Sequence, residues 1–64
     1  MNMPYIICNN DNYLKRDKMN HLSIVHTISE ATKWSDITKA NNVCKNNIKS
    51  LVQTYGLEVK YVSQ

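Results

Sequence analysis

One apolar pattern in the second half of the chain limits the possible folds more than any other feature. Over residues 37–55, apolar side chains recur every three or four residues, at Ile37, Ala40, Cys44, Ile48, Leu51 and Tyr55. This spacing predicts one long α-helix with a single apolar face. Ser35 or Asp36 is expected to cap its start, and Gly56 stands where helices commonly end. Such a helix must bury its apolar face against another element.

Short runs of β-branched and aromatic residues in the rest of the chain predict the strands on which this helix packs. They predict a hairpin over 4–16, a third strand over 21–28 and a fourth over 57–62. The order β-β-β-α-β predicts an α+β fold in one domain over 1–64. We expect a three- to four-stranded antiparallel sheet with one long helix packed on one face.

Asn is unusually frequent and Gly is rare. The 64 residues include nine Asn, one Gly and one Pro. With so little Gly, backbone positions with positive φ are expected to fall on Asn or Asp, which tolerate that conformation better than other residues. The polar clusters at 9–12 and 17–20 are therefore predicted turns. A chain rich in Asn, Lys and Ile is also typical of AT-rich genomes, such as those of Firmicute bacteria, their phages and their plasmids.

The only Trp comes just before the predicted helix. A ring at Trp34 can pack the helix start against the sheet and close the end of a thin core, which is the favoured interpretation. The alternative is an exposed anchor for a partner, a role that Trp often has at interfaces. The residues that lead to it, 29–34, are expected to form a single helical turn capped by Ser29, or an irregular connection.

The first strand carries apolar side chains on both faces. Alternation places Tyr5 and Ile7 on one face, and Ile6 and Cys8 on the other. A single helix covers only one face, whereas the uncovered face of an antiparallel sheet is normally polar. The exposed apolar stripe is therefore expected to contact a protein target or a second copy of the chain, as in a homodimer. The residues predicted to bind the partner are Tyr5, Ile7, Tyr13, Lys15 and Arg16.

The cysteines and histidines form no recognisable catalytic or metal-binding motif. Cys8 and Cys44 lack the short Cys-x-x-Cys spacing of zinc sites, and a strand would point His21 and His26 to opposite faces. On an apolar helix face, Cys44 is expected to be an unreactive packing residue. A single Gly also cannot build a phosphate-binding loop. We therefore expect no enzyme activity, no metal and no cofactor.

The hydropathy pattern predicts a location inside the cell. The first residues have no long apolar run after a basic start, as a signal peptide would, and no stretch is long and apolar enough to span a bilayer. We therefore expect a protein of the host bacterial cytoplasm that has no membrane partner and keeps both thiols reduced.

The formal net charge of +3 leaves nucleic-acid binding open. Basic residues lie around the second turn at Lys15, Arg16 and Lys18, and on the outer helix face at Lys39, Lys45 and Lys49. Together they could contact the backbone of RNA or DNA, with Tyr13 stacking on a base. Acidic residues interrupt both groups, at Asp11, Asp17 and Asp36. That mixture favours an ordinary solvated surface, so nucleic acid is the second choice of partner.

Several of these stretches together resemble small domains of Firmicute and phage proteins. The shared pattern is a Tyr-Ile-Ile strand, an Asn-rich turn, Tyr-Leu, Ala-Thr-Lys-aromatic and a helix with Ala-x-x-Val. Here it falls on Tyr5, Ile6, Ile7, Tyr13, Leu14, Ala31, Thr32, Lys33, Trp34, Ala40 and Val43.

Free-standing chains of this kind include phage-encoded anti-defence proteins, such as anti-CRISPR inhibitors. The resemblance implies a small protein without catalysis that binds its target stoichiometrically, the target being a Cas effector nuclease. The residues leave two alternatives open, a small nucleic-acid-binding regulator and a module that only dimerises or tethers.

Overall fold

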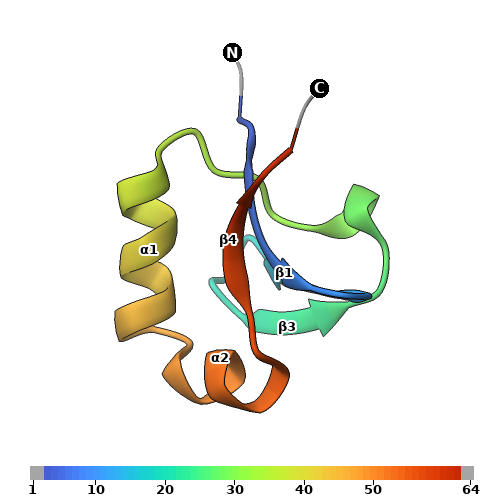
Figure 1. Ribbon diagram of the computed structural model, residues 1–64, viewed down its shortest axis with the longest axis vertical. Coiled ribbons are helices and arrows are strands. Elements are labelled where there is room, and N and C mark those ends of the chain that lie inside the picture. The colour runs from blue at the N-terminus through green and yellow to red at the C-terminus, as the bar shows by residue number, and fades with distance from the viewer. Residues whose placement is uncertain (1–2, 63–64) are drawn as a thin grey trace.

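The computed structural model describes residues 3–62 as one antiparallel sheet with three helical segments (Figure 1). The strands are β1 (Tyr5–Asn9), β2 (Asn12–Arg16), β3 (Leu22–Val25) and β4 (Glu58–Tyr61), in the spatial order β3-β2-β1-β4. The helical segments are the 3₁₀ turn η1 (Ile28–Glu30), α1 (Ile37–Asn46) and α2 (Lys49–Tyr55). The expected α+β fold with an antiparallel sheet is confirmed.

The single long helix is not observed, because the chain breaks it into α1 and α2. The carbonyl of Val43 accepts hydrogen bonds from both Asn47 N (2.9 Å) and Ile48 N (3.1 Å), and α2 starts anew after Ile48. A continuous helix over 37–55 would be about 28 Å long, whereas a five-residue strand spans only about 17 Å. The break lets α2 change direction, so that its apolar side chains pack against the core.

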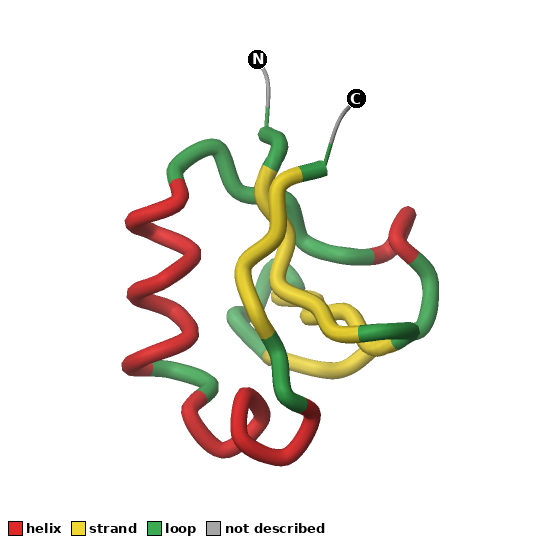
Figure 2. Tube along the Cα trace, viewed as in Figure 1, coloured by secondary structure: helices red, strands yellow, loops and turns green. Residues whose placement is uncertain are grey.

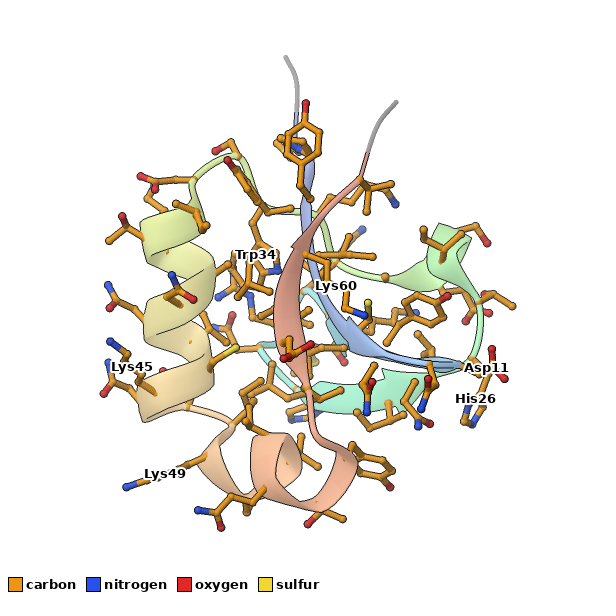
Figure 3. The ribbon with its side chains drawn as sticks, in the orientation of Figure 1. Asp11, His26, Trp34, Lys45, Lys49 and Lys60 are labelled. Carbon is orange, nitrogen blue, oxygen red and sulfur yellow. The ribbon has the colours of Figure 1, made fainter. Side chains whose placement is uncertain are left out.

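The outer surfaces of both helices carry lysines, as the sequence pattern predicts, whereas Ile37 and Tyr55, at the ends of that pattern, are exposed. Lys45 on α1 and Lys49 on α2 project away from the sheet (Figure 3). Asp36 is the N-cap of α1, and its Oδ1 accepts a hydrogen bond from Thr38 N (2.8 Å). Asp36, one of the two predicted caps, therefore starts the first helix.

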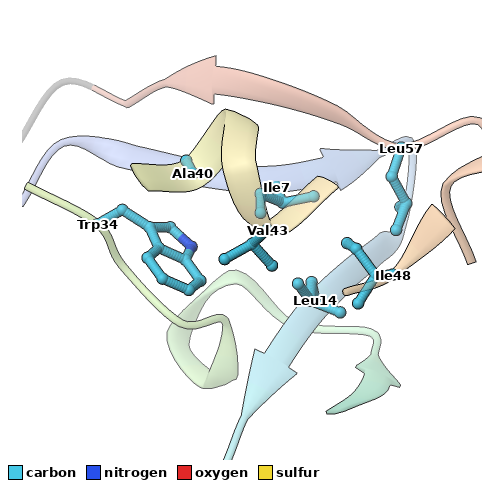
Figure 4. Packing of buried hydrophobic residues seen from close by; sticks show 7 residues of the cluster. All are labelled: Ile7, Leu14, Trp34, Ala40, Val43, Ile48 and Leu57. Carbon is cyan, nitrogen blue, oxygen red and sulfur yellow. The ribbon is translucent and has the colours of Figure 1, made fainter. Parts of the chain in front are cut away.

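The core lies between the sheet and the two helices (Figure 4). Its buried members come from every layer and are Ile7, Leu14, Trp34, Ala40, Val43, Ile48 and Leu57. Ile48, at the break, is 1% exposed, and Leu51 and Val52 of α2 pack against the same cluster. Burial therefore explains the position of the break. The break brings Ile48, Leu51 and Val52 into the core, whereas a straight helix would carry these side chains past the end of the sheet.

The second face of the sheet is covered, which corrects the expectation of an open apolar stripe. η1 and the residues after it lie on the opposite side of β1 and β4 from α1 (Figure 2). Ala31 of this segment is buried with Ile6 and Cys8 in a second small cluster. The η1 loop therefore covers one face of the sheet, and α1 and α2 cover the other. Its first turn is preceded by Thr27 as N-cap, where the sequence suggested Ser29.

Residues 32–34 fill a gap in the sheet. β1 and β2 pair only next to their turn, at Cys8 with Tyr13 and Asn9 with Asn12, and then diverge. Trp34 exchanges backbone hydrogen bonds with Tyr5 (2.8 and 3.1 Å), and Thr32 N donates to the carbonyl of Leu14 (3.0 Å). The segment thus satisfies backbone groups of both strands, as buried backbone requires. It also carries the Trp34 ring, 6% exposed, into the core, so the packing interpretation of Trp34 holds and the exposed-anchor alternative is wrong for the folded chain.

Positive φ angles fall where the composition predicted. They occur at Asn10 (54°) and Asn20 (62°), in the two Asn-containing turns, and at Gly56 (66°), at the end of α2. The side chain of Asn9 donates from Nδ2 to the carbonyl of Tyr55 (3.0 Å), and a Cβ on residue 56 would lie 3.1 Å from that amide nitrogen. The one Gly is therefore required both by its φ angle and by this close approach.

Asp17 closes the turn between β2 and β3. Its Oδ1 accepts hydrogen bonds from Met19 N and His21 N, each at 2.9 Å. These backbone donors, that of His21 first, hold the pKa of the carboxyl below its ordinary value of 3.8. Because the folded pKa is the lower one, the turn is stabilised above that ordinary value and loses this contribution as pH falls through the folded pKa.

We expect the amide NMR signals of Met19 and His21 to titrate together, with a midpoint below the ordinary pKa of an Asp. The Asp17→Asn variant keeps an acceptor oxygen but cannot ionise, so its two amides should show no such transition. A midpoint at the ordinary value in the unmodified chain would show that these hydrogen bonds are not held in solution.

Candidate partner-binding site

The five residues predicted to bind a partner do not share one face of the sheet. Tyr5 and Ile7 face α1 and α2, and Arg16 lies on the same face, directly opposite Leu22. Tyr13 packs against the second cluster on the other face. Lys15, between Leu14 and Arg16, shares that other face by alternation. The structure therefore divides the predicted site into two parts.

Ile7 cannot be part of a binding surface in the folded chain, which corrects the sequence-based prediction. Its side chain is 0% exposed, at the centre of the core cluster. The alternation along β1 was right, but alternation cannot say which face receives the helices. The face with Tyr5 and Ile7 receives them, and Ile6 and Cys8 are buried by the η1 loop.

The structure brings together a different set, Tyr5, Arg16, Trp34 and Tyr61, which we call the Arg16–Tyr61 surface. The rings of Tyr5 and Tyr61 meet edge to face, with centroids 5.7 Å apart and planes at 76°. The guanidinium carbon of Arg16 lies 4.5 Å from the centroid of the Trp34 ring. Trp34 is hydrogen-bonded to Tyr5 through the backbone, so the four residues form one continuous chain of contacts.

Sheet register explains why these side chains meet. Tyr5 and Tyr61 are directly opposite each other on β1 and β4. Val62 N donates to the carbonyl of Pro4 (2.6 Å), which makes the neighbouring Tyr pair a non-hydrogen-bonded one, where side chains approach most closely. Tyr61 ends its strand with its side chain 66% exposed. Stacking thus holds an exposed Tyr and an exposed Arg in place over partly or fully buried rings.

Trp34 contributes its ring to this surface from beneath. Its Nε1 is buried and has no hydrogen-bond partner among residues 3–62. An unpaired buried donor costs about 1–3 kcal/mol. The ring offsets that cost through its contacts in the core cluster and beneath Arg16.

The other basic residues are spread over separate parts of the molecule. Lys18, Lys39, Lys45 and Lys49 are all exposed, and none forms an ion pair within the described part of the chain. Lys39 and Lys45 belong to α1 and Lys49 to α2, whereas Lys18 lies in the β2–β3 turn. The basic residues therefore come from three different elements, and no ion pair among the described residues ties them to an acidic side chain.

The cysteines and histidines are not gathered into one site. Cys8 is buried in the second cluster, whereas Cys44 packs partly buried against the main core on the other side of the sheet. Burial raises the pKa of both thiols; at Cys8 the charge of Lys60 opposes that effect and Glu58 adds to it. His26 Nδ1 lies 3.2 Å from the carbonyl of Asp11, at the opposite end of β3 from His21. Within 3–62, no three His, Cys, Asp or Glu residues are placed to hold a metal ion.

The described surface offers no pocket, and none of the described helices has the length and apolar character to cross a membrane. Comparison of the chain with protein-family models, with curated proteins and with solved structures gave no match. The Arg16–Tyr61 surface is therefore the candidate binding site of this chain.

Proposed function

We propose that this chain is a small binding protein that acts by stoichiometric contact with another protein, without catalysis of its own. The observation that carries the proposal is the Arg16–Tyr61 surface. Tyr, Trp and Arg are enriched at the energetic centres of protein interfaces. Here Tyr61 and Arg16 are exposed but already held by ring contacts, which lowers the entropy lost on binding.

The residues next to this surface carry both signs of charge, a mixture that favours a protein over a phosphate backbone as its partner. Asp17 follows Arg16 directly, and Asp36 lies two residues after Trp34. Carboxylates repel a phosphate backbone, whereas a protein can offer them donors. The alternative, a nucleic-acid-binding regulator, would instead use exposed lysines on the helices and in the β2–β3 turn: Lys18, Lys39, Lys45 and Lys49.

The more specific role that we propose is inhibition of a bacterial defence nuclease, such as a Cas effector, by a phage or mobile-element protein in the cytoplasm of the host cell. The support is the sequence resemblance to phage anti-defence proteins. Cys8 and Cys44, which lie in separate clusters, also suit a reducing compartment.

The test is affinity capture of the tagged protein from cells that carry CRISPR and other defence systems, done in parallel with a Tyr61→Ser variant. We expect a nuclease to co-purify in a fixed molar ratio with the unmodified chain and to be depleted with the variant. Co-purified nucleic acid would contradict the proposal, especially if its log affinity fell linearly with log salt concentration. Equal recovery of the nuclease by both chains would place the binding site elsewhere.

A further inference from the structure

The outer edge of β4 is open. β4 is the last strand of the sheet and pairs only with β1. In Figure 1 it lies in front of β1, with α1 to one side and the η1 loop to the other. These layers cover the faces of the sheet and leave its β4 edge uncovered. An open edge presents unpaired backbone donors and acceptors to another strand.

The register identifies which backbone groups face outward. The hydrogen bond from Val62 N to the carbonyl of Pro4 points Val62 toward β1, and alternation gives Glu58 and Lys60 the same direction. The N–H and C=O groups of Val59 and Tyr61 therefore point away from the sheet. Within the part of the chain that the structure describes, no strand pairs with them.

Two opposite charges accompany these groups. Glu58 pairs with Cys8 and Lys60 with Ile6, so both side chains lie on the face of the second cluster. Both are exposed, and neither forms an ion pair with a described residue. The strand thus has one acidic and one basic residue placed symmetrically about Val59.

We propose that β4 pairs antiparallel with β4 of a second copy of this chain, in the register centred on Val59. Glu58 of each copy then lies directly opposite Lys60 of the other, which gives two cross-strand ion pairs. The two Val59 residues exchange backbone hydrogen bonds, and Tyr61 N of each copy can donate to the carbonyl of Leu57. The dimer is symmetric and joins the two sheets into one.

The neighbouring registers are disfavoured by the same charges. In the register centred on Lys60, the Lys60 side chains of the two copies lie opposite each other. In the register centred on Glu58, the two Glu58 carboxylates lie opposite each other. Charged residues on an edge often serve to prevent pairing. Glu58 and Lys60 oppose strand pairing only in the shifted registers. In the register centred on Val59, each forms an ion pair with the opposite charge of the second copy. β3, the other edge strand, has no charged residue over Leu22–Val25 to select a register.

The test is sedimentation of four chains over low micromolar to millimolar concentrations at low salt. These are the unmodified chain, Glu58→Lys, Lys60→Glu and the double swap. We expect the unmodified chain to dimerise and each single reversal to weaken dimerisation about tenfold or more, because two attractive pairs become repulsive. The double swap should restore it. The single reversals move the net charge in opposite directions, while the double swap leaves it at +3, so net charge cannot explain this pattern.

Two further measurements fix the interface. An equal mixture of the two single reversals should form mixed dimers, because every lysine of one then faces a carboxylate of the other. Amide hydrogens of Val59 and Tyr61 should exchange more slowly at high protein concentration, whereas that of Lys60 should not change. A monomer at millimolar concentration, single reversals that dimerise normally, or a double swap that stays monomeric would each overturn the proposal. The experiment contains no other protein, and Glu58 and Lys60 lie outside the Arg16–Tyr61 surface, so its failure is distinct from failure of the proposed function.

Discussion

Replacing Trp34 with Ala is expected to leave the domain largely unfolded. Truncating a buried Trp costs about 3–5 kcal/mol, and a single core in a chain this short supplies roughly 3–5 kcal/mol in total. The loss is compounded because Trp34 belongs to the segment that fills the gap between β1 and β2 and lies beneath Arg16. Far-ultraviolet circular dichroism and urea denaturation measure the effect.

Trp34→Phe is the matched control. It keeps an aromatic ring in the core and removes the indole N–H, which has no partner among the described residues. We expect this variant to fold, with a loss of stability well below that of Trp34→Ala. If Trp34→Ala were nearly as stable as the unmodified chain, the ring would not be the packing residue that the structure shows.

Replacing Ile7 with Ala is expected to have the second-largest effect, a loss of about 2–5 kcal/mol. Ile7 is fully buried, whereas Ile28 on η1 is an Ile of identical chemistry that is 45% exposed. Ile28→Ala should change stability by only about 0.5 kcal/mol. Urea midpoints of the two variants give the comparison directly. Equal losses would mean that Ile7 is not the fully buried core residue that the structure shows.

Much of the fold could be predicted from local sequence. Short runs of β-branched and aromatic residues predict the four strands, Asn residues mark both turns with positive φ, and Gly56 and one of the two cap candidates, Asp36, mark the helix limits. Each of these signals depends on a residue and its near neighbours. These signals can therefore be read without knowing how distant parts of the chain pack.

The two misjudged features depend on distant parts of the chain. The apolar period runs unbroken through Ile48 and gives no sign of the break, whereas strands of four or five residues are too short to pack against one helix over 37–55. The cover of the second sheet face is carried by Ala31, a small side chain in a segment whose one large apolar residue, Ile28, is exposed, so the segment has no apolar pattern to detect. The helix break and the cover of the second face are therefore both determined by the size of the folded sheet, which no local stretch of sequence specifies.

The candidate site could be predicted only in part. The sequence predicts Tyr5 and Arg16, but it groups Ile7, Tyr13 and Lys15 with them because local sequence does not show what covers each face of the sheet. Tyr61 is not among the residues that the sequence predicts, although alternation along 57–62 puts it on one face with Leu57 and Val59. Its position as the last residue of its strand was the available signal, since the side chain there extends beyond the packed core.

The most direct test of the Arg16–Tyr61 surface is the affinity of the captured partner for two folded variants of this chain. Tyr61→Ser changes an exposed ring of that surface, and the double variant Lys45→Gln with Lys49→Gln changes two exposed helix lysines outside it. Calorimetric titration should show a loss of about 2 kcal/mol for Tyr61→Ser, roughly thirtyfold in Kd, and little change for the lysine variant. Circular dichroism should show both variants folded. Normal binding by Tyr61→Ser together with lost binding by the lysine variant would contradict the account and favour a site on the helices.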